Sequence, residues 1–285
     1  MLHSGDQIGI VCCSDGHAPQ RKRTNQLLEN TLRDIGLHPV WSPYIYEKDA
    51  VFSGTGEERA EAVNRFYRDD TIRAIFDISG GNVANNVLEY LDYDLIRQHP
   101  KPFFGYSDLT TVHHAIYTKT GNKGYLYQLR NLVAQEKDVQ KIRFQETMLA
   151  GKTTLWDADY TFLRGERTEG TVLGGNLRCL LKLAGTPYWP DLQGKVLFLE
   201  SLGGGVGEVT AMAVQLRQIG VFEQISGLLL GTFAHMEEQN LQPTAPELFL
   251  RITEKAGIPV AQTREIGHGA GSKGLIIGGE ICLTK

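Results

Sequence analysis

Apolar and polar positions alternate in blocks along the first half of the chain. Short apolar runs rich in strand-forming residues occupy residues 7–13, 73–78 and 102–106. Between and after these runs lie longer segments with apolar residues at helical spacing, of which 21–35 and 108–119 are the clearest. Strands that alternate with helices in this way predict a parallel sheet that is covered by helices on both faces.

The second half also alternates short strands with helices, and a polar segment separates the two halves. Residues 151–170 are polar and only weakly periodic, which is typical of a linker. We therefore expect an N-terminal α/β domain over residues 1–150, a linker over 151–170 and a C-terminal domain over 171–285. No internal repeat or low-complexity segment interrupts this division.

Composition narrows the class of protein. The chain has 285 residues, of which 41% are hydrophobic and 22% charged, as in ordinary globular proteins. The net charge is −4 and lysines and arginines form no block, so we expect neither a nucleic-acid partner nor a membrane surface. No apolar run approaches the roughly 18 residues of a membrane span, and the first residues lack the features of a signal peptide. We therefore expect a cytoplasmic protein.

The four cysteines fit the same expectation. Cys12 and Cys13 are adjacent in an apolar run, and neither Cys179 nor Cys282 belongs to a Cys-x-x-Cys pair. This spacing argues against a disulfide framework and against a zinc site. We expect buried, reduced thiols.

The most informative segment is residues 101–108, with the sequence KPFFGYSD. A buried strand there leads directly into a helix, and Ser107 lies at the turn between them. A nucleophile elbow has this arrangement, because the serine hydroxyl then stands above the sheet edge near a helix N-terminus. The Gly-x-Ser-x-Gly pattern is absent, since Asp108 fills the place next to Ser107. The alternative is that Ser107 only caps the helix.

A serine nucleophile needs a base and a group that orients the base. His268 lies between two glycines after a candidate strand, where an imidazole is free to project into a cleft. Glu200 ends the apolar strand 196–199, and beside His268 it would hold the imidazole tautomer. The alternatives are a solvent-exposed loop histidine and a carboxylate that begins a solvated loop. Spacing alone leaves this triad a hypothesis.

A glycine-rich turn, residues 79–82, follows the strand 73–78 and lies near the same sheet edge as Ser107. Its amides could approach a substrate closely, because glycine has no side chain. The alternative is a simple strand–helix turn. Neither this turn nor the glycine-rich run 203–207 matches a phosphate-binding loop pattern.

Several motifs together resemble those of the serine LD-carboxypeptidases, a family that includes muramoyl-tetrapeptide carboxypeptidase and the microcin C self-immunity peptidase. The matching segments are collinear over nearly the whole chain: residues 79–85, 91–94, 100–102, 105–110, 174–177, 185–187, 194–200 and 267–269.

The resemblance implies roles for five residues. Ser107 would be the nucleophile, Glu200 the acidic member of the triad and His268 the general base. The oxyanion hole would be formed by the backbone amides of Asp108 and Gly81. No metal ion and no organic cofactor is expected.

The resemblance also implies a fold and an assembly. The family has an N-terminal, flavodoxin-like α/β domain with a parallel sheet and a smaller C-terminal α/β domain with a mixed sheet. The active site lies between the two domains, and homodimers are usual. We therefore expect this architecture and a homodimer for this chain.

The chain departs from the usual family pattern at three places. Residues 79–83 read Ser-Gly-Gly-Asn-Val where many members have Arg-Gly-Gly-Tyr-Gly. Ser201 follows Glu200 where many members have aspartate, and a glycine-rich run, 203–207, comes next. Residues 125–130 replace an expected Gly-Pro motif. These departures leave the triad intact and affect what the resemblance implies about the substrate.

We expect a serine carboxypeptidase that cleaves the L,D-amide bond before the terminal D-amino acid of a murein tetrapeptide during cell-wall recycling. Its partner would be a small peptide or muropeptide. The candidates for substrate binding are Asn82, Arg130, Trp156 and Arg178. One alternative is an immunity-type peptidase that cleaves an aminoacyl-nucleotide amide, with Trp156 as a platform for the base. Another is a ligand-binding homologue that has lost catalysis.

Overall fold

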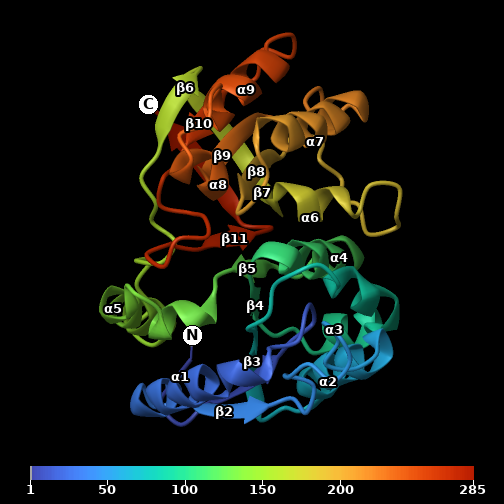
Figure 1. Ribbon diagram of the computed structural model, residues 1–285, viewed down its shortest axis with the longest axis vertical. Coiled ribbons are helices and arrows are strands. Elements are labelled where there is room, and N and C mark those ends of the chain that lie inside the picture. Colours follow the sequence, from blue (N-terminus) through green and yellow to red (C-terminus); the bar gives the residue numbers. More distant parts are fainter. Residues whose placement is uncertain (1) are drawn as a thin grey trace.

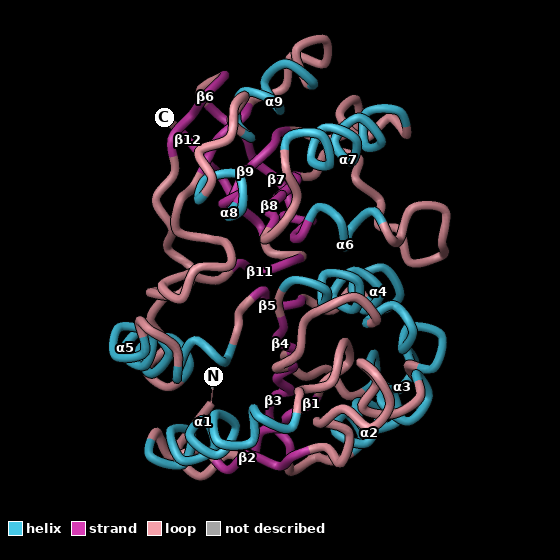
Figure 2. The backbone as a smooth tube through the Cα atoms, viewed as in Figure 1, coloured by secondary structure: helices cyan, strands magenta, loops and turns pink. Residues whose placement is uncertain are grey.

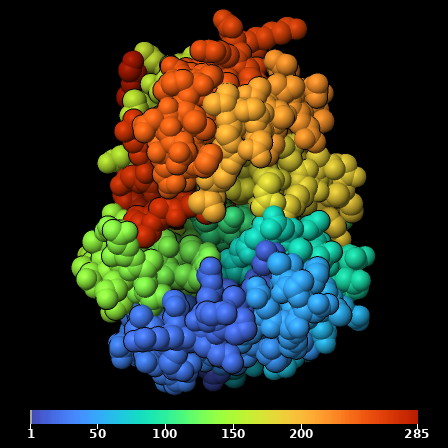
Figure 3. Space-filling view, viewed as in Figure 1, coloured from blue at the N-terminus to red at the C-terminus, as the bar shows by residue number. Residues whose placement is uncertain are grey.

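The computed structural model describes residues 2–285, whose strands form two six-stranded sheets stacked end to end (Figures 1 and 2). The N-terminal half, blue to green in Figure 1, contributes five strands of the first sheet, and the C-terminal half, yellow to red, contributes the second sheet and the sixth strand of the first. The two halves are in contact on the face that Figure 3 shows.

The first sheet has the order β11-β5-β4-β3-β1-β2. The five strands from the first half are parallel to one another, and β11 (Leu275–Ile277) pairs antiparallel with β5. The parallel strands are β1 (Gln7–Val11), β2 (His38–Trp41), β3 (Ile72–Asp77), β4 (Phe103–Gly105) and β5 (Gly124–Leu126).

Helices cover both faces of this sheet (Figure 1). One apolar cluster joins the sheet to α1 and α5, and a second cluster joins it to α2, α3 and α4. The prediction of a parallel sheet covered on both faces is thus confirmed. The α-helices are α1 (Lys22–Asp34), α2 (Gly56–Arg68), α3 (Tyr93–Gln98), α4 (Thr110–Thr120) and α5 (Lys137–Met148). The 3-10 helices are η1 (Pro19–Arg21), η2 (Ala84–Tyr90), η3 (Ser107–Leu109) and η4 (Leu129–Val133).

The second sheet is mixed, with the order β12-β7-β8-β9-β10-β6. Its four central strands are parallel, and both edge strands run antiparallel to their neighbours. Its strands are β6 (Thr161–Arg164), β7 (Arg167–Asn176), β8 (Val196–Ser201), β9 (Gly227–Phe233), β10 (Val260–Gln262) and β12 (Glu280–Thr284). Its helices are α6 (Leu177–Leu181), α7 (Val206–Gln218), α8 (Ala234–Glu238) and α9 (Ala245–Ile252).

Local sequence accounts for where several helices begin and end. Thr55 accepts a hydrogen bond from the amide of Glu58 and Glu58 bonds back to Thr55, so α2 begins with a capping box. Thr244 and Glu247 start α9 in the same way. Gly121 ends α4 with a φ of 77°, a conformation that glycine adopts without steric cost.

The structure differs from expectation in the segment between the halves. Part of the expected linker, 151–170, is strand, because β6 lies within it and β7 begins at Arg167. β6 is an edge strand whose side chains are exposed or half-buried, so it carries little hydrophobic signal. β11 follows most of the second sheet in the sequence, yet it completes the first sheet. Short strands of this kind are assigned by their pairing, which sequence patterns do not show.

Three of the four cysteines are buried. Cys12, Cys13 and Cys179 are buried, but Cys282 is exposed on the edge strand β12, so the expectation of burial was wrong for Cys282. None of the helices within residues 2–285 has the length and apolar character needed to cross a membrane.

Candidate active site

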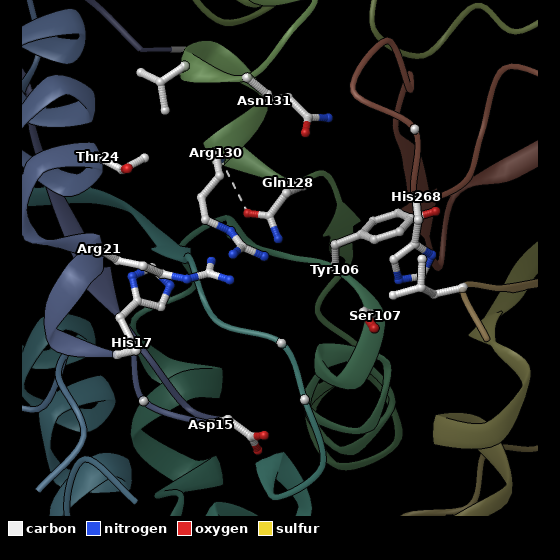
Figure 4. A pocket seen from close by; sticks show the side chains of 18 of the residues that line it. Asp15, His17, Arg21, Thr24, Tyr106, Ser107, Gln128, Arg130, Asn131 and His268 are labelled. Atoms are coloured by element: carbon white, nitrogen blue, oxygen red, sulfur yellow. Dashed lines mark hydrogen bonds between the residues drawn. The ribbon is translucent and has the colours of Figure 1, made fainter. Parts of the chain in front are cut away.

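A cavity of about 590 Å³ lies where the carboxyl ends of the first sheet face the C-terminal half (Figure 4). Both halves of the chain line it. Its lining includes Asp15, His17, Arg21, Glu47, Gly80, Gly81, Tyr106, Ser107, Arg130 and His268.

Ser107 lies at the sharp turn between β4 and α4. It has a φ of 59°, in the left-handed region that non-glycine residues rarely adopt. A residue held there costs about 1–3 kcal/mol, which the surrounding structure must offset. Ser107 is the first residue of η3, whose N-cap is Tyr106, and no side chain caps that helix. The strained turn therefore fits the nucleophile elbow, and the capping alternative does not describe Ser107.

Glu200 and His268 form a short contact. Glu200 is the fifth residue of the buried strand β8 and is 1% exposed. The Nδ1 atom of His268 lies 2.6 Å from the Oε2 atom of Glu200, and the other oxygen accepts a hydrogen bond of 3.1 Å from Asn176 Nδ2. Since a carboxylate accepts, the geometry assigns the proton to Nδ1 and leaves Nε2 free to accept one.

The free side of the imidazole faces the cavity end that contains Ser107. His268 Nε2 is buried and has no hydrogen-bond partner within residues 2–285. Figure 4 shows Ser107 and His268 as neighbours at the same end of the cavity. The ring of Tyr106 packs edge-on against the imidazole, with ring centroids 5.1 Å apart. The arrangement can move a proton from a serine hydroxyl to a histidine that a carboxylate orients.

The glycine-rich turn borders the same end. Gly81 has a φ of 131°, and a Cβ atom there would lie 2.1 Å from the Asp15 carboxylate carbon. Glycine is therefore required on both grounds. Asp15 also accepts a hydrogen bond from the amide of Asn82 at 2.8 Å. These contacts hold the turn in a fixed shape beside Ser107.

The C-terminal half contacts the turn at Ser107 through polar groups. Thr110 Oγ1 donates to the carbonyl of Ser107 at 2.7 Å and accepts from the amide of Asn176 at 3.0 Å. His114 Nδ1 donates to the carbonyl of Thr110, and its Nε2 accepts from the amide of Gly174 at 2.9 Å. The segment that supports Glu200 is thus hydrogen-bonded to the helix that follows Ser107.

A buried ion pair forms another contact between the halves. The carboxylate of Asp108 is fully buried and accepts from Ser14 Oγ at 2.7 Å and from the amide of Ala84 at 2.8 Å. Lys182, which follows α6, binds the same carboxylate and also donates to the carbonyl of Asn82 at 2.8 Å. One ammonium group therefore connects the residue after Ser107 with the glycine-rich turn.

The structure separates the four expected substrate-binding residues. Arg130 lines the cavity. Arg178 does not, because it donates to the Asn82 side chain at 2.8 Å and to the Gly81 carbonyl at 2.9 Å. Trp156 lies outside this cavity and packs against Tyr125, with ring centroids 5.7 Å apart. Its placement there does not support the expected role as a platform.

Sequence reasoning missed several residues that shape the site. Asn176 stands in a motif that the sequence displays, but its contact with Glu200 depends on the pairing of β7 with β8. His114 is fully buried, and its contact with the amide of Gly174 also depends on how the two halves pack. Lys182 gave no signal, and Thr110 appeared only as the last residue of the motif 105–110, because contacts across two domains follow from the packing and not from local spacing.

Comparison with known proteins identifies the family. A sequence profile described as the LD-carboxypeptidase N-terminal domain matches residues 8–128, and one described as the LD-carboxypeptidase C-terminal domain matches residues 169–283. The chain belongs to the LD-carboxypeptidase family. This confirms the resemblance inferred from the motifs and makes the protein a serine-type carboxypeptidase.

The individual relatives include carboxypeptidases and a self-immunity protein. The chain is 28% identical to a probable murein peptide carboxypeptidase of Bacillus subtilis (strain 168), over 99% of this chain and 90% of the relative. It is 25% identical to the microcin C7 self-immunity protein MccF of Escherichia coli, over 94% and 87%. The crystal structure of an MccF-like protein from Bacillus anthracis str. Ames superposes with a TM-score of 0.85 at 25% identity, over 100% of this chain and 95% of that one. These similarities confirm the fold class of two α/β domains.

Proposed function

We propose that this LD-carboxypeptidase family member uses Ser107, His268 and Glu200 to hydrolyse the L,D-amide bond before the terminal D-amino acid of a murein tetrapeptide. The observation that carries the proposal is the 2.6 Å contact between Glu200 and His268, whose unpartnered Nε2 lies at the same end of the cavity as Ser107. The similarity to a murein peptide carboxypeptidase supports the class of substrate.

The reaction proceeds through an acyl-enzyme. Ser107 Oγ attacks the carbonyl carbon of the amide while His268 Nε2 accepts the hydroxyl proton. Glu200 stabilises the imidazolium that forms, and Asn176 keeps the carboxylate in place. His268 then gives the proton to the leaving amine, which breaks the amide bond and releases the D-amino acid.

The second half of the reaction restores the enzyme. His268 takes a proton from water, the resulting hydroxide attacks the acyl carbon, and the serine leaves with the proton from His268. In both steps we assign the backbone amides of Asp108 and Gly81 to the developing oxyanion. Donors of this kind typically contribute about 2.7–4 kcal/mol to transition-state stabilisation.

Mass spectrometry of a murein tetrapeptide incubated with the protein tests this proposal. Wild-type protein should remove one terminal alanine, and Ser107→Ala should leave the peptide intact. A fluorophosphonate should label the wild type but not the variant, which separates a peptidase from a catalytically silent homologue. An unlabelled wild type would contradict the proposed nucleophile.

The same catalytic groups could act on an aminoacyl-nucleotide amide, and the similarity to MccF favours this as a second candidate. A labelled wild type that leaves the tetrapeptide intact but cleaves such an amide would establish the second candidate. The position of Trp156 outside the cavity gives this candidate no base platform from that residue.

Location and assembly belong to the same proposal. Muropeptide recycling places the enzyme in the cytoplasm, and the family resemblance favours a homodimer without a metal or organic cofactor. Light scattering of the purified protein gives the mass in solution, and a monomeric mass would contradict the dimer.

A further inference from the structure

Two arginines in the cavity have no acidic partner. Arg130 and Arg21 both line the cavity, and neither takes part in an ion pair within residues 2–285. The Nε atom of Arg130 is buried and has no hydrogen-bond partner among the described residues. Buried charges in proteins are normally paired, so a lone guanidinium facing a cavity indicates an anionic ligand.

The two guanidinium groups influence each other. Burial lowers the pKa of Arg130 from its usual value, and the charge of Arg21 lowers it further. Figure 4 shows both side chains extending into the middle of the cavity. Two like charges brought together without a counter-ion repel each other, and an anion bound between them would remove that repulsion.

The remaining charged groups of the cavity do not neutralise the arginines. Asp15 is engaged by the amide of Asn82. Glu47 also lines the cavity but forms no ion pair with either arginine. His17 adds no positive charge at neutral pH, because burial and then the charge of Arg130 lower its pKa to about 4.

Arg130 lies close to the place where the scissile bond would bind. Its Nη2 atom lies 4.0 Å from the point that a Cβ atom of Gly80 would occupy. Gly80 adjoins Gly81, whose amide we assign to the oxyanion. An anion bound by Arg130 would therefore lie close to the carbonyl that Ser107 attacks.

We propose that Arg130, assisted by Arg21, binds the free carboxylate of the amino acid that the enzyme releases. This inference rests on the proposed function and adds the feature that would make the enzyme an exopeptidase. In a terminal amino acid a single carbon separates the scissile nitrogen from the carboxylate. A carboxylate on the side chain of the residue that supplies the scissile carbonyl lies farther from the scissile bond. A planar guanidinium can bind the terminal carboxylate with two parallel hydrogen bonds.

Kinetics with a matched pair of substrates test the assignment. The tetrapeptide and its C-terminal amide differ only in the terminal charge, and the wild type should prefer the free acid by at least about 100-fold in kcat/KM. Arg130→Gln should lose about 100-fold on the free acid and less than about 3-fold on the amide. Arg130→Lys keeps the charge but loses the two parallel donors of the guanidinium group. This variant should therefore prefer the free acid over the amide more than Arg130→Gln does, but less than the wild type.

Arg23→Gln serves as the control. Arg23 is exposed on the same helix as Thr24 and does not line the cavity, so its loss should leave both substrates unaffected. Equal losses on acid and amide in Arg130→Gln would overturn the assignment, because they would indicate a general structural role. A wild type that does not discriminate between acid and amide would overturn it as well.

Binding measurements separate this inference from the proposed function. Calorimetry with Ser107→Ala needs no turnover, and Ser107→Ala should bind the tetrapeptide acid more tightly than the amide only when Arg130 is present. If the acid binds more tightly in this way but the wild type does not hydrolyse the tetrapeptide, the proposed reaction is refuted and the assignment of the carboxylate subsite stands. An aminoacyl phosphoramidate carries its anion on the atom bonded to the leaving nitrogen. If Arg130 is needed for binding the phosphoramidate but not for binding the tetrapeptide acid, the anion that Arg130 binds is a phosphoryl group. That result would overturn the carboxylate assignment.

Discussion

At the scale of single residues, the orientation of His268 depends on two strands and a loop. β8 supplies Glu200, the end of β7 supplies Asn176, and the loop after β10 supplies the imidazole. Gly267 fits there because a Cβ atom would lie 1.7 Å from Thr232 Oγ1. The loop therefore packs directly on β9, and this contact holds the imidazole beside the carboxylate.

Glu200→Gln should lower kcat by about 10³-fold or more while KM changes little. The amide keeps the shape of the side chain but can no longer stabilise the imidazolium. Asn176→Ala should cause a smaller loss, about 10–100-fold, because Glu200 keeps its contact with His268 and loses one charge-assisted hydrogen bond. Steady-state kinetics measure both, and full activity of Glu200→Gln would exclude Glu200 from the triad.

Sequence reasoning worked best for residues at strand ends. Ser107 and Glu200 follow or end apolar runs, so their positions at a sheet edge could be inferred without a structure. The same reasoning did not show where side chains point. It therefore could not distinguish Arg130, which faces the cavity, from Arg178, which binds the glycine-rich turn.

At the scale of elements, the contact between α4 and β7 determines how the two halves meet. Both ring nitrogens of His114 are used, one within α4 and one toward the amide of Gly174. Gly175 approaches α4 so closely that a Cβ atom would lie 2.5 Å from Thr110 Oγ1. The glycines of this motif thus allow the backbone of β7 to pack against the helix after Ser107.

His114→Leu should lower the free energy of unfolding by about 1–3 kcal/mol. Leucine leaves the buried amide of Gly174 without an acceptor and the carbonyl of Thr110 without this donor. Urea denaturation measures the change. His38→Leu, at an exposed position of β2, should stay within about 0.5 kcal/mol of the wild type. Equal stability of His114→Leu and wild type would show that this contact contributes nothing.

At the scale of the whole molecule, buried histidines make stability depend on pH. Burial lowers the pKa values of His17, His113 and His114 to about 4, whereas unfolded histidine titrates near 6.5. Between these values the unfolded chain binds more protons than the folded one, so stability is retained above pH 6.5 and is lost as the pH falls toward 4.

Urea denaturation at pH 7.5, 6 and 5 checks this dependence. Each histidine should contribute a loss of about 1 kcal/mol per pH unit below 6.5. His114→Gln should reduce the slope by about one proton even if the variant is less stable at pH 7.5. His38→Gln should leave the slope as it is, because His38 is exposed. A flat profile between pH 7.5 and 5 would contradict the burial of neutral histidines.

The overall architecture was predictable where periodic patterns are long. The alternation of strands and helices in the first half predicted a parallel sheet covered on both faces, and the family resemblance implied the mixed second sheet. β6 was not predicted, because its side chains are exposed or half-buried at the edge of a sheet, and the place of β11 at the edge of the first sheet was not predicted either. Their pairing depends on the assembled domains, which no local pattern encodes.

The chain path near residue 275 also determines which contacts between strands form last during synthesis. β11 pairs with β5 in the first sheet, and β12, which follows it directly, pairs with β7 in the second. A nascent chain that has left the ribosome only as far as residue 260 therefore exposes the open edge of β5, although its first half is otherwise complete. His268 emerges just before β11. The growing polypeptide thus acquires its proposed general base only shortly before that edge is covered, and an unfinished chain lacks one member of the proposed triad.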